Sequence, residues 1–175
     1  TDIRAMLSTC TRLRELKLAE TGLWPFNRVY SKIYCTEEAF RAEVDGAFAA
    51  MGFGFDEDGN PQKQLPIVIS LANSSVTDMS ALSNVHTLYL QGCTGITDVS
   101  ALGNVHKLNL EGCTGITDVS ALGNVHTLNL GGCTGITDVS ALGSVHELNL
   151  DACPGITDVS ALGNVHKLNL WRCTG

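Results

Sequence analysis

A strict 20-residue repeat is the feature that most limits how this chain can fold. Four successive segments begin at Cys93, Cys113, Cys133 and Cys153, and the second of them reads CTGITDVSALGNVHTLNLGG. Residues 76–92 are a looser copy, VTDMSALSNVHTLYLQG. A period of 20 is too short for a helical hairpin and suits one short strand followed by a tight return. The copies therefore predict a stacked, solenoid-type fold.

The apolar positions within each copy predict which side chains are buried. In the triplet Leu108-Asn109-Leu110 a polar residue separates two leucines, so both leucines should point one way and the asparagine the other. Stacking would align these triplets into a parallel sheet whose leucines face a core that no single copy could bury. The other apolar positions expected in this core are Val105 in the same copy, and Ile116, Val119 and Leu122 in the next.

These phased positions resemble the leucine-rich-repeat consensus. The pattern Val-x-x-Leu-x-Leu-x-x-Cys-x-x-Ile has Val in the first Leu slot and Cys in the Asn/Cys slot. The Gly-Ile-Thr-Asp run is similar to the cysteine-containing class found in F-box-type proteins. The Thr-Asp-Val-Ser-Ala-Leu segment is similar to the convex turns of internalin-like repeats. The resemblance implies an α/β solenoid, a right-handed superhelix with a parallel sheet on its concave side and short helical turns on its convex side.

The same resemblance divides one continuous solenoid domain into three parts. Residues 1–23 are similar to a degenerate repeat, residues 24–64 form an insertion, and residues 65–175 form the repeat array. Within the insertion, apolar residues at helical spacing predict a helix over residues 37–51. This helix should pack on the solenoid, with docking of a partner as the alternative. The missing initiator Met and the end in mid-repeat indicate a fragment of a longer chain.

Two kinds of residue are expected to shape the turns. The first is a glycine after each strand, expected to adopt a positive φ. These glycines are Gly95, Gly115, Gly135 and Gly155. The second is an aspartate expected to cap a helical turn by accepting backbone N–H bonds. These aspartates are Asp98, Asp118, Asp138 and Asp158. A calcium ladder is the alternative for the aspartates, but the repeat lacks the Gly-x-Asp nonapeptide pattern.

Five of the seven cysteines occupy one repeat position, namely Cys93, Cys113, Cys133, Cys153 and Cys173. Their odd count and 20-residue spacing signal neither a Cys-x-x-Cys zinc site nor a disulfide framework. The resemblance implies that this slot points inward and bonds backbone carbonyls. We therefore expect a column of buried, reduced thiols and an intracellular location, in the cytoplasm or another reducing compartment.

Five histidines also share one position and should form a ladder at the start of the strands. They are His86, His106, His126, His146 and His166. One hypothesis is a ladder that binds metal or senses pH, since imidazoles ~5 Å apart disfavour simultaneous protonation. The alternative is a structural histidine fixed by recent duplication. No column of carboxylates stands beside it in the sequence, so we expect neither a metal site nor a cofactor.

Charge and motifs narrow the class of function. The net charge of −7 leaves no basic footprint for nucleic acid. No run approaches the eighteen consecutive apolar residues that a membrane span needs, so membrane insertion is not expected. The sequence also lacks a Gly-x-Ser-x-Gly elbow and a phosphate-binding loop, so we expect a non-enzymatic protein.

Differences between the copies suggest where a partner would bind. The convex-turn residues hardly vary, whereas the positions after the histidine and after the second strand leucine do. We therefore expect a protein–protein interaction module whose concave face meets a partner, with drift in a young duplication as the alternative for the variation. The alternative function is a structural or assembly component of a larger complex. The candidate partner-binding residues are Tyr89, Gln91, Lys107, Asn109, Glu111, Asn129, Glu147, Asn149, Asp151, Lys167, Asn169, Trp171 and Arg172.

Overall fold

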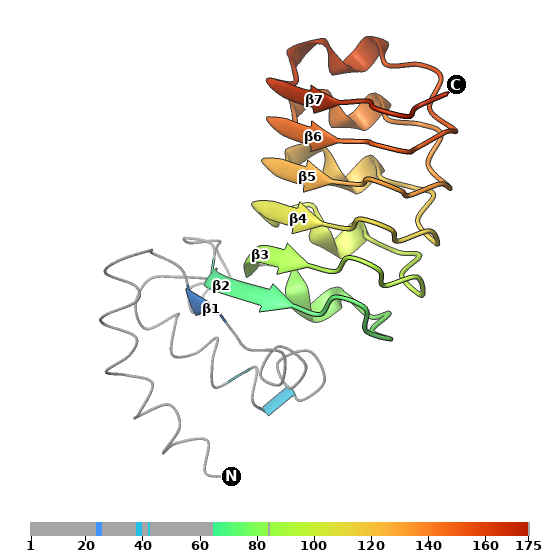
Figure 1. Cartoon of the computed structure of the whole chain (residues 1–175). Coiled ribbons are helices and arrows are strands. Elements are labelled where there is room, and N and C mark those ends of the chain that lie inside the picture. The colour runs from blue at the N-terminus through green and yellow to red at the C-terminus, as the bar shows by residue number, and fades with distance from the viewer. Residues whose placement is uncertain (1–23, 26–37, 40–41, 43–64, 84, 175) are drawn as a thin grey trace.

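The structure, a computed structural model, describes residues 24–25, 38–39, 42, 65–83 and 85–174. These residues contain one seven-stranded sheet in which the strands follow one another in chain order (Figure 1). The strands are β1 (Trp24–Pro25), β2 (Leu65–Ser70), β3 (Val85–Tyr89), β4 (Lys107–Asn109), β5 (Thr127–Asn129), β6 (Glu147–Asn149) and β7 (Lys167–Asn169). The 3-10 helices between them are η1 (Ser80–Leu82), η2 (Ser100–Leu102), η3 (Ser120–Asn124), η4 (Ser140–Ser144) and η5 (Ser160–Asn164).

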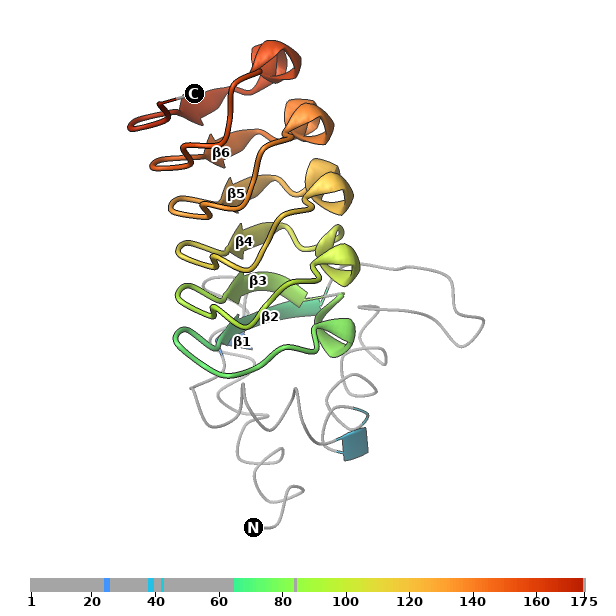
Figure 2. The ribbon, with the colours of Figure 1, turned by 90° about the vertical axis from the view of Figure 1, so that its right-hand side faces the viewer.

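The strands pair in parallel and keep the sequence period as their register. Leu108 lies opposite Leu128, which in turn lies opposite Leu148, so equivalent positions of successive copies are neighbours in space. The sheet lines one side of a right-handed coil and the 3-10 helices line the other (Figure 2). The stack curves toward the sheet, which makes the sheet face concave and the helix face convex. The solenoid predicted from the repeat is confirmed.

The predicted core residues are buried. Leu108, Leu128 and Leu148 are at most 2% exposed, and the Val, Leu, Cys and Ile positions of the interior copies are likewise closed to solvent. Each 3-10 helix contributes a buried leucine side chain to the core, as Leu122 does from η3. One copy could not enclose these side chains, so each depends on the copies stacked above and below it.

The glycine prediction was wrong in its position. The left-handed glycines among the described residues are Gly92, Gly112 and Gly132, with φ of +71° to +72°, three positions before the glycines that we expected. Gly115 has an ordinary φ, and glycine is required there because a Cβ would be sterically crowded. A Cβ at Gly115 would lie 2.7 Å from the Ile96 carbonyl oxygen in the preceding copy. The left-handed turn comes where the chain leaves the strand, and the later glycine lets neighbouring turns approach closely.

The aspartate prediction holds for the hydrogen bond and was wrong for the cap position. Asp118 Oδ1 accepts the Ser120 N–H at 2.9 Å, and the other three aspartates make the same bond. The N-cap of η3 is Val119, which has no side-chain capping bond, so Asp118 lies one residue outside the helix. This hydrogen bond from the Ser120 backbone lowers the pKa of the exposed Asp118 carboxyl.

Ala152 and Arg172 occupy the same left-handed position with φ of +55° and +58°. Replacing Ala152 by Gly should raise the free energy of unfolding by about 1 kcal/mol, because a Cβ is strained in this conformation. The reverse change, Gly132→Ala, should lower it by a similar amount, since the added Cβ meets nothing closer than 3.7 Å and only the backbone conformation opposes it. Urea unfolding of both variants would test this, and effects of the same sign would contradict it.

The predicted degenerate repeat over 1–23 lies outside the described residues, as does most of the predicted insertion over 24–64. Trp24 and Pro25, which we assigned to the insertion, form β1 and pair in parallel with β2. Of the predicted helix over 37–51, the described residues Glu38, Ala39 and Ala42 are helical and exposed. Among the described residues there is no helix long and apolar enough to cross a membrane.

Candidate partner-binding face

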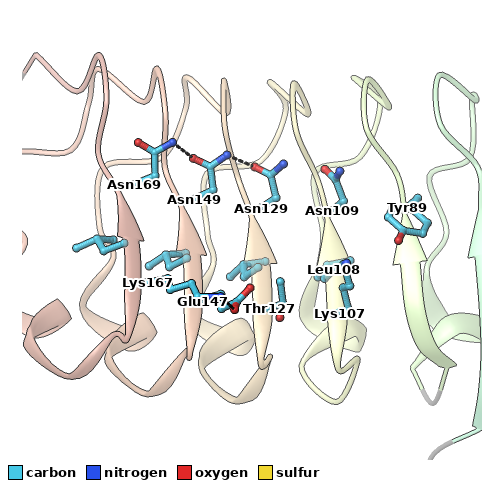
Figure 3. A pocket seen from close by; sticks show the side chains of 13 residues that line it. Tyr89, Lys107, Leu108, Asn109, Thr127, Asn129, Glu147, Asn149, Lys167 and Asn169 are labelled. Atoms are coloured by element: carbon cyan, nitrogen blue, oxygen red, sulfur yellow. Dashed lines mark hydrogen bonds and ion pairs between the residues drawn. The ribbon is translucent and has the colours of Figure 1, made fainter.

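The outward face of β3 to β7 carries a shallow groove of about 490 Å³ (Figure 3). Alternation along each strand positions its walls, because the residues on either side of the buried leucine point away from the core. One column precedes that leucine and is chemically mixed, and the other follows it and is almost all asparagine. The groove is lined by Tyr89, Lys107, Leu108, Asn109, Thr127, Leu128, Asn129, Glu147, Leu148, Asn149, Lys167, Leu168 and Asn169.

The asparagine column is held in place by hydrogen bonds in two directions. The Asn149 amide donates to Asn129 Oδ1 at 2.9 Å, and the Asn169 amide donates to Asn149 Oδ1 at 2.9 Å (Figure 3). Each of these carbonyl oxygens also accepts a backbone N–H two residues further on, as where Asn149 accepts the Asp151 N–H at 3.0 Å. The Asn129 amide instead donates to Glu111 Oε2 at 3.1 Å. The column is therefore a preorganised polar surface.

The mixed column brings opposite charges together at one end of the groove. Lys167 forms an ion pair with Glu147 on the adjacent strand. The hydrogen bond from Lys167 lowers the pKa of the half-buried Glu147 carboxyl, and the positive charge of Lys167 acts in the same direction. Lys107 on β4 and Tyr89 on β3 lie in the lining at the opposite end of the same groove. The groove thus offers a cation and an aromatic ring at one end and an ion pair at the other.

The structure divides the predicted site residues into two groups. Eight of them line the groove, whereas five belong to the turns that follow the strands and do not. The five are Gln91, Glu111, Asp151, Trp171 and Arg172. Sequence alternation put both groups on one face, but it does not show that the chain turns away after the asparagine. Thr127 also lines the groove, although it is not among the predicted residues. It occupies the variable position after the histidine, between Lys107 and Glu147 of the neighbouring copies, and this position could have identified it.

Trp171 and Arg172 form a compact pair at the rim. The Arg172 guanidinium lies 4.2 Å from the centroid of the Trp171 ring. It also donates from Nε and Nη2 to the two Asp151 carboxylate oxygens, at 3.1 and 2.7 Å. Trp171 is 66% exposed. An aromatic ring held beneath a paired guanidinium is the kind of anchor found at protein interfaces.

The five repeat cysteines are free thiols, and the predicted buried column is confirmed for Cys93 to Cys153, with Cys173 half-buried. Each thiol donates to a strand-end carbonyl of the preceding copy, as where Cys133 Sγ bonds the Leu110 carbonyl at 3.1 Å. Burial raises the pKa of Cys113 to about 11 and that of Cys133 to about 12. These thiols therefore satisfy the carbonyls of the turn and remain protonated at neutral pH.

The raised thiol pKa values predict a loss of stability in alkali. Each buried thiol has a higher pKa in the folded chain than in the unfolded chain. Its contribution to the free energy of unfolding is therefore fully present below pH 9 and is lost as the pH rises toward 11 for Cys113 and 12 for Cys133. Between pH 9 and about 12, the Cys133 thiol should lower the free energy of unfolding by about 1.4 kcal/mol for each pH unit. Urea unfolding between pH 8 and 11 should show a shallower decline for Cys133→Ala than for the parent chain. Parallel declines would contradict this account.

The histidines form the expected ladder at the start of the strands. Adjacent ring centroids are 4.6 to 4.7 Å apart in all four pairs, from His86 to His166. Partial burial lowers the pKa of His86 and His106, and the charge of the next histidine lowers it further. Among the described residues there is no group of three or more His, Cys, Asp or Glu side chains that could hold a metal ion. The hypothesis that the ladder senses pH and the alternative of a structural histidine both stay open.

With its 20-residue period, in-register parallel strands and inward cysteine column, the described array is a leucine-rich-repeat solenoid. No model of a known protein family matches the sequence, and no curated protein matches it. Solved structures of three Listeria monocytogenes internalins match part of this chain. This chain spans less than two thirds of the length of each of them.

The three internalins differ in how much of each chain is aligned. InlF is 30% identical with a TM-score of 0.46, and the match covers 57% of this chain and 33% of InlF. The functional domain of InlJ, which includes a cysteine ladder, is 16% identical with a TM-score of 0.43, over 61% of this chain and 25% of that one. Internalin C2 is 22% identical with a TM-score of 0.36, over 59% of this chain and 61% of that one.

Proposed function

We propose that this chain is a non-enzymatic interaction module that binds a protein partner through the concave face of its sheet. The observation that carries the proposal is the groove along β3 to β7, whose lining comes from five consecutive strands. One column is fixed by hydrogen bonds and the other carries Lys107, Thr127, Glu147 and Lys167. A rigid base beside a chemically varied column suits recognition of a particular partner surface.

The composition of the groove supports a polar, extended partner. Four leucines lie in its lining, of which Leu168 is 39% exposed, and the polar groups are amides, two lysines, one glutamate, one threonine and a tyrosine. A shallow and open hollow with this lining suits peptide or protein side chains that pair with Lys107 and stack on Tyr89. The rim pair of Trp171 and Arg172 extends the contact area beyond the groove.

A selection experiment tests this proposal while the partner is unidentified. Peptides displayed on phage would be selected on the intact chain, and the affinity of the recovered peptides would be measured by isothermal titration calorimetry. Lys107→Glu should weaken binding by roughly 10-fold or more, because it reverses a charge within the groove. Ala141→Glu, which adds a carboxylate to the exposed convex surface of η4, should leave affinity within about 2-fold.

Two results would contradict concave binding. One is a set of selected peptides whose affinity responds to Ala141→Glu and not to Lys107→Glu. The other is equal loss in both variants while the unfolding temperature of each matches that of the parent chain. Either result would mean that the peptides bind outside the groove along β3 to β7.

A further inference from the structure

Backbone hydrogen bonds fix which way the side-chain amides of the asparagine column point. The Gly131 N–H donates to Asn129 at 3.0 Å, and the Asp151 N–H donates to Asn149 at 3.0 Å. A backbone N–H can only donate, so the atom that it meets in each amide is the carbonyl oxygen and not the nitrogen. The two ends of each amide are therefore distinguished, and every amide nitrogen in the column acts as a donor.

The carbonyl oxygens of the asparagine column are fully used, whereas its N–H groups are not. Asn129 Oδ1 accepts one backbone N–H and the Asn149 amide, which fills both of its lone pairs. Asn149 Oδ1 is filled in the same way by a backbone N–H and the Asn169 amide. The Asn129 and Asn149 nitrogens each use one of their two N–H groups in bonds among the described residues. One N–H of each is therefore left over, for water or for a partner.

Asn109 adds further donors at the next position of the column (Figure 3). Its Oδ1 accepts the Glu111 N–H at 2.9 Å, and its amide nitrogen donates to no other described residue. The strand register places Asn109 beside Asn129 and Asn129 beside Asn149. With neighbouring strands ~4.8 Å apart, these three residues offer a line of N–H donors about 10 Å long.

The asparagine column already binds one carboxylate of the chain itself. The Asn129 amide donates to Glu111 Oε2 at 3.1 Å, and not to the carbonyl oxygen of Asn109. A carboxylate accepts hydrogen bonds without offering a proton in return, which suits a surface whose own acceptors are filled. A hydroxyl-rich partner such as a glycan needs acceptors as well as donors, and the carbonyl oxygens of Asn129 and Asn149 have no lone pair left for it.

Lys107 adds an uncompensated positive charge beside the asparagine column. The register places it between Thr87 on β3 and Thr127 on β5, so no carboxylate lies opposite it. Two ion pairs form among the described residues, and neither of them includes Lys107. The Glu147 carboxylate in the lining is already paired with Lys167. The groove therefore holds one cation more than its own carboxylates neutralise.

We propose that the groove binds an acidic, extended segment of a protein, whose carboxylates accept hydrogen bonds from the asparagine column and pair with Lys107. This inference rests on the proposed use of the concave face and adds the chemistry of the partner to it. Alternate side chains of an extended chain are about 7 Å apart, so two carboxylates separated by one residue fit along the line of donors. The net charge of −7 opposes a long polyanion such as a nucleic acid and favours a short acidic segment.

The test begins with an unbiased peptide library displayed on phage and selected on the intact chain. Groove-binding peptides are identified with Thr127→Trp, which fills the middle of the groove without changing its charge. These peptides should be enriched in Asp and Glu over the unselected library. Synthetic versions with Asn for each Asp and Gln for each Glu should bind roughly 10-fold or more weakly in fluorescence anisotropy, because they lose the charge and one acceptor oxygen.

Asn109→Asp tests the contribution of the asparagine column. The substitution keeps the shape of the side chain and the oxygen that accepts the Glu111 N–H, but it removes the N–H donors and adds a negative charge. Affinity for the acidic peptides should fall by roughly 10-fold or more. Ala141→Glu, on the convex surface of η4, makes the same change in net charge and should leave affinity within about 2-fold. Thermal unfolding of both variants would verify that each is folded.

The outcomes separate this inference from the proposed function. Groove-binding peptides without enrichment in Asp and Glu would overturn the inference and leave concave binding intact. Acidic peptides whose affinity is unchanged by Asn109→Asp would overturn it as well. A selection that yields no peptide sensitive to Thr127→Trp would contradict both proposals. A single-stranded DNA oligonucleotide that binds more tightly than the acidic peptides, and is sensitive to Thr127→Trp, would replace the acidic segment with a nucleic acid.

Discussion

Leu128→Ala should lower the free energy of unfolding by about 2–5 kcal/mol, the largest effect that we expect from a single substitution. Leu128 lies at the centre of β5, is 1% exposed, and is flanked in register by Leu108 and Leu148. Truncation removes apolar contacts with both neighbouring copies and leaves a cavity that the fixed strand spacing prevents from closing. Urea unfolding followed by circular dichroism would measure the loss.

The matched control is Leu168→Ala in β7. Leu168 occupies the same repeat position, but it is 39% exposed and has a neighbouring copy on one side only. Its truncation should cost about 1 kcal/mol or less, since part of the side chain already contacts water. Equal losses at the two positions would mean that the stacking of copies contributes little to stability, against the solenoid account.

Gly143→Ala should lower the free energy of unfolding by about 1–3 kcal/mol through overcrowding. The added Cβ would lie 2.5 Å from the Ala161 carbonyl oxygen, so the backbones of two adjacent 3-10 helices must separate. Thermal unfolding would report the loss as a lower midpoint. The substitution removes no contact, so the effect would come only from the closeness of the convex turns.

Gly163→Ala is the control for this second prediction. Gly163 lies at the same position of η5 as Gly143 in η4, and its Cβ would meet no atom within 4 Å. The variant should be neutral or more stable by up to about 1 kcal/mol, because alanine restricts the unfolded chain more than glycine does. Destabilisation of the same size at both glycines would show that the local turn, and not the next copy, requires the glycine.

The buried thiols and the asparagine column show how far the repeat pattern can be read without coordinates. Both lie at fixed positions of every copy, so once copies stack in register their neighbours are their own counterparts. For Cys133 the resemblance implied a bond to a carbonyl of the turn, and the structure places its thiol on the Leu110 carbonyl. For Asn149 the alternation with leucine predicted an outward side chain, and the in-register stacking brings its amide to Asn129 Oδ1.

The turn details could not be read in this way. The position of Gly115 is glycine in every full copy, whereas the position of Gly112 also accepts Ala152 and Arg172, so the repeat favoured the wrong glycine for positive φ. Only the packing of one turn against the next shows that Gly115 is crowded by the Ile96 carbonyl. The division of the candidate site into groove and rim has the same origin, because it depends on where the chain leaves the sheet.

The sequence by itself determined the solenoid, its register and its buried columns, because a period of 20 leaves one way to stack strands of this hydrophobic pattern. Tertiary structure alone decided which glycines are crowded and which outward residues share a groove. Those properties arise between copies. They depend on the distance from one backbone to the next, which no single repeat contains.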